Sequence, residues 1–78
     1  MRGYTVVLEQ EKDGGFVVSV PALPGCFTQG ESRSEAVKNA REAIAAYIEE
    51  LRGRGEEPPL ELKTETEYLE LPELEYGT

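Results

Sequence analysis

The secondary structure of this chain is organised around one stretch, Pro21-Ala-Leu-Pro-Gly-Cys-Phe-Thr-Gln-Gly-Glu-Ser-Arg-Ser-Glu-Ala36. Pro21 ends the strand before it, because proline has no amide hydrogen to donate to a neighbouring strand. The two prolines and the glycine of residues 21–25 predict a rigid turn. Residues 26–29 then predict a short strand, which Gly30 closes.

The second half of this stretch opens one long amphipathic helix. Ser32 and Glu35 have the spacing of a capping box, in which the serine side chain accepts from the amide three residues on and the glutamate reaches back. Basic residues and glycines at the far end favour termination, so we expect the helix over residues 34–52. Apolar residues recur between these ends at spacings of three and four, which places them on one face: Val37, Ala40, Ile44, Tyr47, Ile48 and Leu51.

Upstream of the turn, the sequence predicts a hairpin of two strands. Residues 4–10 alternate between the two faces of a strand in β-forming residues, the pattern of a half-buried strand. Residues 11–15 end in Asp-Gly-Gly, which favours a tight hairpin loop. Residues 16–20 repeat the alternation, and we expect them to pair with the first strand.

Downstream of the helix, the sequence predicts a linker and one more strand. Two consecutive prolines, at positions 58 and 59, cannot continue a helix and indicate a linker. A fourth strand is expected within Thr64–Leu71, where glutamates, which are poor strand formers, interrupt the pattern. From residue 72 onward the chain has the character of a tail, with Leu74 and Tyr76 as candidate anchors on a neighbouring molecule.

These elements predict a single α+β domain of order β-β-β-α-β over residues 1–78. Three antiparallel strands form a meander, and the helix crosses it to return a fourth strand, parallel to the first, through a right-handed crossover. The face away from the helix carries Thr5, Val7, Val17 and Ser19, which have no cover in a single chain. A domain of this size buries only about 60–65% of its unfolded surface. We therefore expect a second copy or a partner protein to cover that face.

The negative charge of the chain is concentrated in one segment. The formal net charge is −8, and residues 56–78 contribute −7 of it through eight glutamates and Lys63. Binding of nucleic acid needs clustered basic residues, so direct contact with nucleic acid is not expected. An acidic segment suits a basic protein partner, because opposite charges accelerate the encounter. It is equally compatible with a solvated tail that maintains solubility.

The composition argues against catalysis. The chain has no histidine, so Cys26 lacks an imidazole base to activate it. The strand order is that of the first half of an RNase H-like nuclease, whose metal ions need an acidic residue in the middle of the first strand. That position is occupied by Val6-Val7-Leu8. We expect no enzymatic activity, no cofactor and no metal, with a metal-dependent nuclease as a distant alternative.

The sequence also carries an expectation about location. No apolar run approaches the roughly 20 residues of a membrane span. The first residues do not begin a signal peptide, and a single cysteine fits a reducing compartment. A cytoplasmic protein without membrane contact is therefore expected.

The block from Pro21 to Ala36 resembles the signature of the HicB-like antitoxin family, in which a proline–x–leucine–proline–glycine–cysteine turn precedes a glycine, a helix cap and a Glu-Ala pair. The resemblance extends over residues 4–59. It implies a degenerate, partial RNase H-like sheet without nuclease activity, self-association into dimers or tetramers, and neutralisation of a small basic HicA-type toxin that cleaves mRNA. Typical members add a C-terminal DNA-binding domain, for which the residues up to Thr78 leave no room, so a short form is expected.

Two sets of residues follow from these patterns. The structural set forms the turn, its closing glycine and the helix start: Pro21, Pro24, Gly25, Cys26, Gly30, Ser32, Glu35 and Ala36. The partner-binding set combines acidic and apolar residues of the expected fourth strand: Glu65, Glu67, Tyr68, Leu69 and Glu70. The leading hypothesis is a non-catalytic antitoxin that occludes a basic toxin. The alternative is a solitary oligomeric domain with a structural or regulatory role and no toxin.

Overall fold

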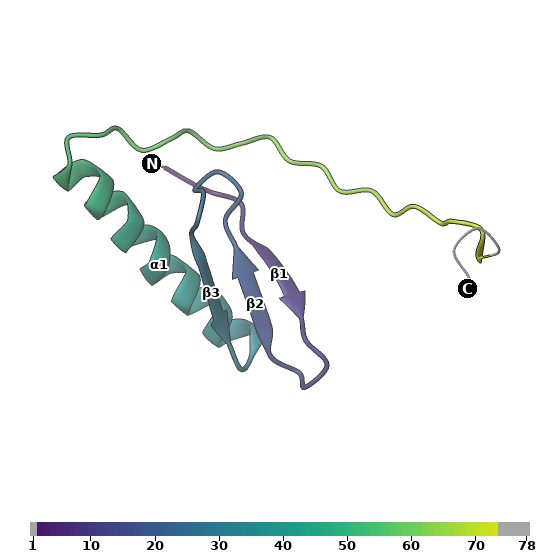
Figure 1. Ribbon diagram of the computed structural model, residues 1–78. Coiled ribbons are helices and arrows are strands. Elements are labelled where there is room, and N and C mark those ends of the chain that lie inside the picture. The colour runs from purple at the N-terminus through teal and green to yellow at the C-terminus, as the bar shows by residue number, and fades with distance from the viewer. Residues whose placement is uncertain (1, 74–78) are drawn as a thin grey trace.

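A three-stranded antiparallel sheet with one long helix across it makes up the fold (Figure 1). The computed structural model describes residues 2–73. The elements are β1 (Val7–Gln10), β2 (Phe16–Ser19), β3 (Phe27–Gly30) and α1 (Arg33–Gly53), and the sheet order is β1-β2-β3. The predicted α+β class, the meander and the single helix are confirmed.

The paired part of the β1–β2 hairpin is shorter than the alternating pattern in the sequence predicted. Pairing begins at Val7 opposite Ser19 and ends at Gln10 opposite Phe16. The expected pairing of residues 4–6 does not form, because the partner strand stops before Pro21, which has no amide to donate. The loop closes through the Glu11 amide, which donates to the carbonyl of residue 15 at 2.7 Å.

The turn after β2 supplies one of two small core clusters. The Leu23 amide donates to the carbonyl of Val20 at 3.0 Å, and the Cys26 amide donates to that of Leu23 at 3.0 Å. These bonds fold the three side chains inward, where all are buried and pack against Tyr47 and neighbouring apolar residues. Burial raises the pKa of the Cys26 thiol, so it is held as the neutral thiol rather than the reactive thiolate.

Both ends of α1 are capped. Ser32 is the N-cap, and its side chain accepts from the Glu35 amide at 3.1 Å. The Glu35 carboxylate reaches back to the amide of Glu31 at 2.7 Å, one residue earlier than a standard capping box. At the other end Gly55 has φ of +76°, and its amide donates to the Arg52 carbonyl, so Gly55 takes the left-handed position that ends the helix.

The helix packs closely on the β2–β3 side of the sheet. Ala36 and Ala40 are buried against Val18 and form the second core cluster. Their small side chains let the first turns of α1 approach the end of β3 at Gly30. In Figure 1 the helix accordingly lies beside β3, and β1 is the far edge of the sheet.

The fourth strand is not formed in the described part of the chain. Residues 54–73 contain no strand, and residues 64–71 are exposed throughout. The alternating pattern at 64–71 was not enough, because a strand forms only where its backbone pairs with a neighbouring strand, and this segment extends away from the sheet. Leu74 and Tyr76, the candidate tail anchors, lie outside the described residues. Among residues 2–73 no helix has both the length and the apolar character needed to cross a bilayer.

Candidate protein-binding surface

The sheet face opposite α1 is a semi-apolar surface. Val18 points to the helix, so its neighbours on β2 point to the other face. The register sets Val7 opposite Ser19 and Ser19 opposite Phe27, which makes one continuous row across three strands. Val7 and Ser19 are half-buried, whereas Phe27 is 71% exposed. We name this the outer sheet face, and the uncovered face expected from the sequence is present within residues 2–73.

Phe27 is the residue of this face that the sequence analysis missed. Its signal was available, because residues 26–29 predicted a strand and successive residues of a strand face opposite sides, so that Phe27 faces away from the buried Cys26. A phenylalanine exposed on the face of an edge strand has the character of an interface anchor, since aromatic side chains dominate binding energy at protein contacts.

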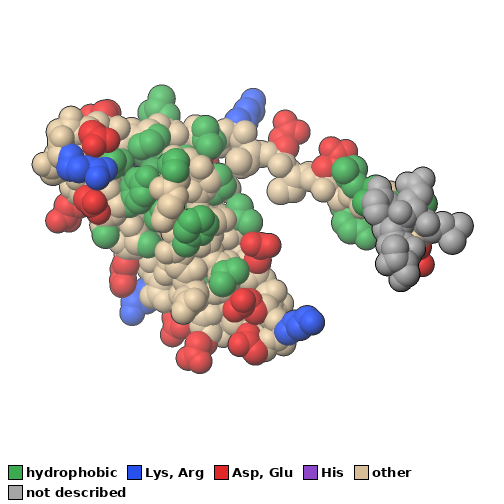
Figure 2. Space-filling model, viewed as in Figure 1, with side chains coloured by type: hydrophobic (Ala, Val, Ile, Leu, Met, Phe, Trp, Pro, Cys, Tyr) green, Lys and Arg blue, Asp and Glu red, His purple; other side chains and the backbone are tan. Residues whose placement is uncertain are grey.

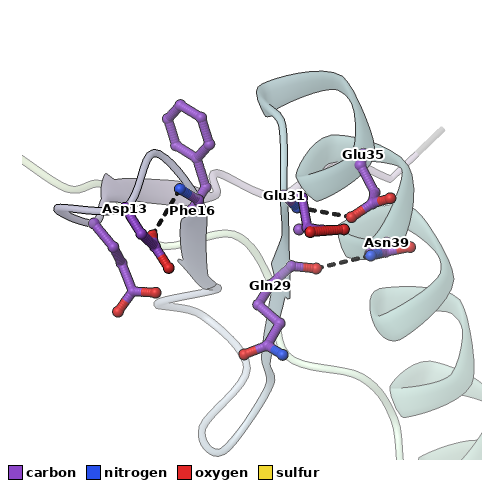
Figure 3. A pocket seen from close by; sticks show the side chains of 9 residues that line it. Asp13, Phe16, Gln29, Glu31, Glu35 and Asn39 are labelled. Atoms are coloured by element: carbon purple, nitrogen blue, oxygen red, sulfur yellow. Dashed lines mark hydrogen bonds between the residues drawn. The ribbon is translucent and has the colours of Figure 1, made fainter.

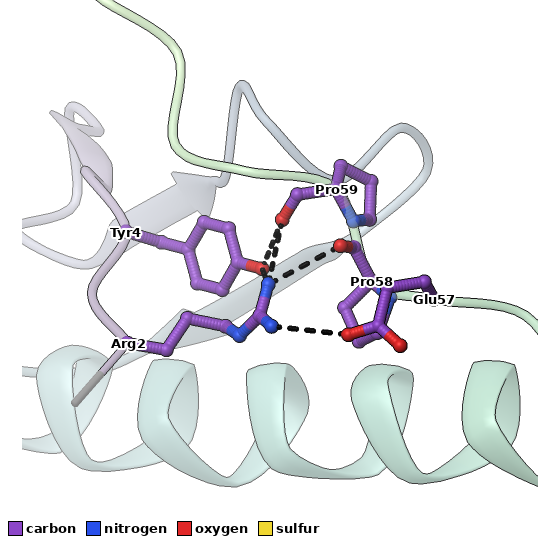
Figure 4. A network of polar contacts seen from close by, with 5 residues as sticks. All are labelled: Arg2, Tyr4, Glu57, Pro58 and Pro59. Carbon is purple, nitrogen blue, oxygen red and sulfur yellow. Dashed lines mark hydrogen bonds and ion pairs between the residues drawn. The ribbon is translucent and has the colours of Figure 1, made fainter.

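The linker after α1 is fixed to the N-terminal residues (Figure 4). The Arg2 guanidinium donates to the carbonyls of Pro58 and Pro59, each at 3.2 Å, and forms an ion pair with Glu57 at 3.3 Å. The Tyr4 hydroxyl also donates to the Pro59 carbonyl. The hydrogen bond to Tyr4 raises the pKa of Arg2, and Pro58 is buried. This network had no counterpart in the sequence analysis.

One further contact determines where the chain leaves the domain. The amide of Thr5 donates to the Glu61 carboxylate at 2.8 Å, and the Thr5 hydroxyl donates to the same oxygen. Beyond this point the chain extends away from the sheet, as Figure 1 shows. We call residues 60–73 the C-terminal arm. The arm therefore leaves the domain beside Thr5, which lies two residues before the start of β1 and next to the open edge of the sheet.

The partner-binding set predicted from the sequence lies on this arm and is fully available. Tyr68 is 85% exposed and Leu69 is 71% exposed. The three glutamates of the set are also exposed: Glu65, Glu67 and Glu70. In Figure 2 the arm carries both carboxylate and hydrophobic side chains. The structure keeps the set in one segment but does not bring it together with the outer sheet face.

An apolar groove separates the N-terminal residues from α1. It has a volume of about 480 Å³. It exists because α1 packs over β2 and β3, which leaves the helix-facing side of Val6 only partly covered. Two arginines are its only charged lining residues among those that the structure describes, and the lining includes Val6, Val37, Ile44, Ile48, Arg2 and Arg41.

An acidic notch of about 290 Å³ lies between the hairpin loop and the start of α1 (Figure 3). Its carboxylates hold the backbone in place. Asp13 accepts from the amide of residue 15 at 3.0 Å, and Glu35 caps the helix. Asn39 donates to the Gln29 carbonyl at 2.7 Å. Across residues 2–73 no three carboxylate or thiol groups converge as metal ligands would.

The sequence matches a family model described as the HicB_like antitoxin of bacterial toxin-antitoxin systems over residues 4–77. The chain belongs to the HicB-like antitoxin family. This confirms the resemblance drawn from the turn and the helix cap, and it extends through the C-terminal arm.

Relatives of this HicB-like chain include short and long proteins. It is 55% identical over 56 residues to a UPF0150 protein of Thermoplasma acidophilum, a match covering 72% of this chain and 81% of that protein. It is 35% identical over 69 residues to Antitoxin HicB 1 of Photorhabdus laumondii, covering 88% of this chain and 44% of that protein. The crystal structure of the N-terminal domain of Burkholderia pseudomallei antitoxin HicB superposes with a TM-score of 0.63 at 33% identity, covering 78% of this chain and 69% of that one.

Proposed function

We propose that this HicB-like chain is a non-catalytic antitoxin module that neutralises a small, basic, mRNA-cleaving toxin of the HicA type by occluding its RNA-binding surface. The observation that carries the proposal is the exposed Phe27 on an uncovered sheet face. The C-terminal arm of the same molecule is acidic and forms no strand. Family membership supports a role in a toxin–antitoxin system. Because the target is mRNA, the complex would act in the cytoplasm, and it needs no cofactor.

The two parts of the surface have different physical roles. A surface that binds RNA is basic, so it attracts the glutamates of the arm during diffusion. These charges are exposed and act mainly on the association rate. The outer sheet face supplies apolar area that is buried only once the partners have docked, and this area governs dissociation.

An alternative function rests on the same exposed face. A semi-apolar sheet surface fits a second copy of the chain as well as a toxin, since both would remove Phe27 from water. In that case the chain is a solitary oligomeric domain with a structural or regulatory role. Native co-purification followed by mass measurement separates the two. A basic partner of about 60 residues supports the antitoxin, and a homo-oligomer alone supports the alternative.

Removing the arm's charge is expected to slow toxin binding. Changing Glu65, Glu67 and Glu70 together to glutamine should lower the association rate by about tenfold at low salt. The loss should shrink as ionic strength rises, because salt screens exposed charges. Stopped-flow mixing at two salt concentrations measures both effects.

A matched control for this triple variant lies on α1. Changing Glu42, Glu49 and Glu50 to glutamine removes the same charge from the exposed side of the helix. The association rate should then fall less than in the arm variant. If both triple variants slow binding equally, only the net charge matters and the arm has no special role.

Truncation of the exposed aromatic residue is expected to weaken the bound state. Phe27→Ala should raise the dissociation rate by about 30-fold, the size of a typical interface hot spot. The association rate should change little, because no charge is altered. Since the side chain is 71% exposed, the variant should keep the thermal stability of the parent chain. Surface plasmon resonance with an immobilised toxin measures both rates, and an unchanged dissociation rate would remove the outer sheet face from the interface.

A further inference from the structure

The C-terminal arm has the sequence of a strand but no strand partner. Its even-numbered positions from 60 to 68 are Leu, Leu, Thr, Thr and Tyr, whereas the odd-numbered positions from 61 to 67 are Glu, Lys, Glu and Glu. This alternation sorts apolar and charged side chains onto opposite faces of an extended chain. Leu60, Leu62 and Tyr68 are nevertheless exposed. The apolar face of the arm is thus uncovered in a single chain.

The sheet has an open edge at β1 to which such an extended segment could pair. β1 pairs only with β2 among the described residues, so its other side presents unpaired backbone amide and carbonyl groups. A strand added there would place alternate side chains on the helix side of the sheet. That side is where the apolar groove opens beside Val6. The open edge of β1 and the apolar groove together form a binding site for one amphipathic strand, which we call the seat.

Charge favours an acidic occupant of this seat. Arg2 and Arg41 are the charged residues of the groove lining, and within residues 2–73 Arg41 forms no ion pair. Residues 56–78 carry a net charge of −7, whereas the rest of the chain is close to neutral. The arm carries Glu70 on the same face as Tyr68. It therefore complements both the apolar residues of the groove and the two arginines that line it.

We propose that the C-terminal arm of one copy adds as a fourth strand beside β1 of a second copy, with Leu62 and Tyr68 in its apolar groove. Two copies exchange arms about a two-fold axis, which closes the assembly. The arm departs beside Thr5 and points away from its own sheet, so exchange requires only that it continue onto a neighbour (Figure 1).

Arm exchange also has a consequence for toxin binding, and this consequence rests on the proposed function. The odd-numbered residues of an added strand lie on the outer sheet face. Glu65, Glu67 and Leu69 of one copy would then extend the surface that carries Phe27 of the other. The toxin-binding surface is complete only in the dimer.

The assembly is tested with the full chain and no toxin, so that its failure is distinct from failure of toxin binding. Analytical ultracentrifugation should give twice 8.6 kDa for the parent chain at micromolar concentration. The variant L62D/Y68D should raise the dimer dissociation constant at least 100-fold, because two charges replace groove-filling side chains. Leu69→Asp, on the opposite face of the arm, should change it less than threefold.

A mixing experiment identifies exchange itself. Ala45→Glu places a charge in the groove at an exposed helical position, so it should block the seat without unfolding the chain. This variant alone and L62D/Y68D alone should both be monomeric. Their mixture should form a heterodimer, because an intact arm then meets an intact groove. A monomeric parent chain, equal effects of the Leu69 and Leu62/Tyr68 changes, or no heterodimer in the mixture would each overturn the proposal.

Discussion

Replacement of Gly30 by alanine is expected to lower the free energy of unfolding by about 3 kcal/mol. A methyl group at this position would lie 2.4 Å from the backbone nitrogen of Ala36 and 2.7 Å from its Cα. These atoms belong to the first turn of α1, so they cannot move away without separating the helix from β3. A domain of this length has a total stability of about 4–12 kcal/mol, and the change removes a large part of it.

Thermal unfolding followed by circular dichroism measures this loss. At about 4–8 °C per kcal/mol, Gly30→Ala should melt roughly 12–24 °C below the parent chain. Gly53→Ala is the matched control, because the added methyl group would meet nothing within 4 Å beyond its chain neighbours and the backbone of its own helix. Gly53 ends α1, where alanine favours helix, so its melting temperature should stay the same or rise. Equal melting temperatures for the two variants would refute the role assigned to the contact between β3 and α1.

Truncation of Leu23 is expected to have a comparable effect through a different cause. Leu23 has an exposed fraction of 0% and packs with Val20 and Cys26 in the turn cluster. Leu23→Ala removes apolar contacts and leaves a cavity, at a cost of about 2–5 kcal/mol. In urea, with a slope of about 1 kcal/mol per molar for so small a domain, the midpoint should fall by about 2–5 M.

Two companion variants show whether this loss comes from packing. Leu69→Ala deletes the same atoms from the arm, where the side chain is 71% exposed, and should shift the urea midpoint by less than 0.5 M on the scale of ordinary surface changes of about 0.5 kcal/mol. Leu23→Met keeps most of the volume and should cost less than about 1.5 kcal/mol. A midpoint shift for Leu23→Met as large as that for Leu23→Ala would contradict a cavity as the cause.

The sequence predicted the elements that depend on local chemistry. Pro21 ended β2 because it lacks an amide hydrogen, and Ser32 with Glu35 marked the start of α1 because side-chain groups satisfy free helix amides. The same block of residues, from Pro21 to Ala36, carried the resemblance to the HicB-like antitoxin family. For the surface, the sequence singled out acidic and apolar residues of the arm, which the structure leaves exposed, as a partner-binding set, and that role stays a prediction. It overlooked Phe27 and gave the arm a strand that the described part of the chain does not form.

The sequence by itself therefore determined the order of the elements, the turn, the helix cap and the concentration of charge after residue 55, because each depends on residues close together along the chain. Only the tertiary structure decided where the linker is fixed and which surfaces are left open. The contacts of Arg2 with Pro58 and of Thr5 with Glu61 join residues 56 apart, and no local pattern encodes them. The groove likewise arises from the placement of α1 over β3, a consequence of small residues meeting at Gly30 and Ala36.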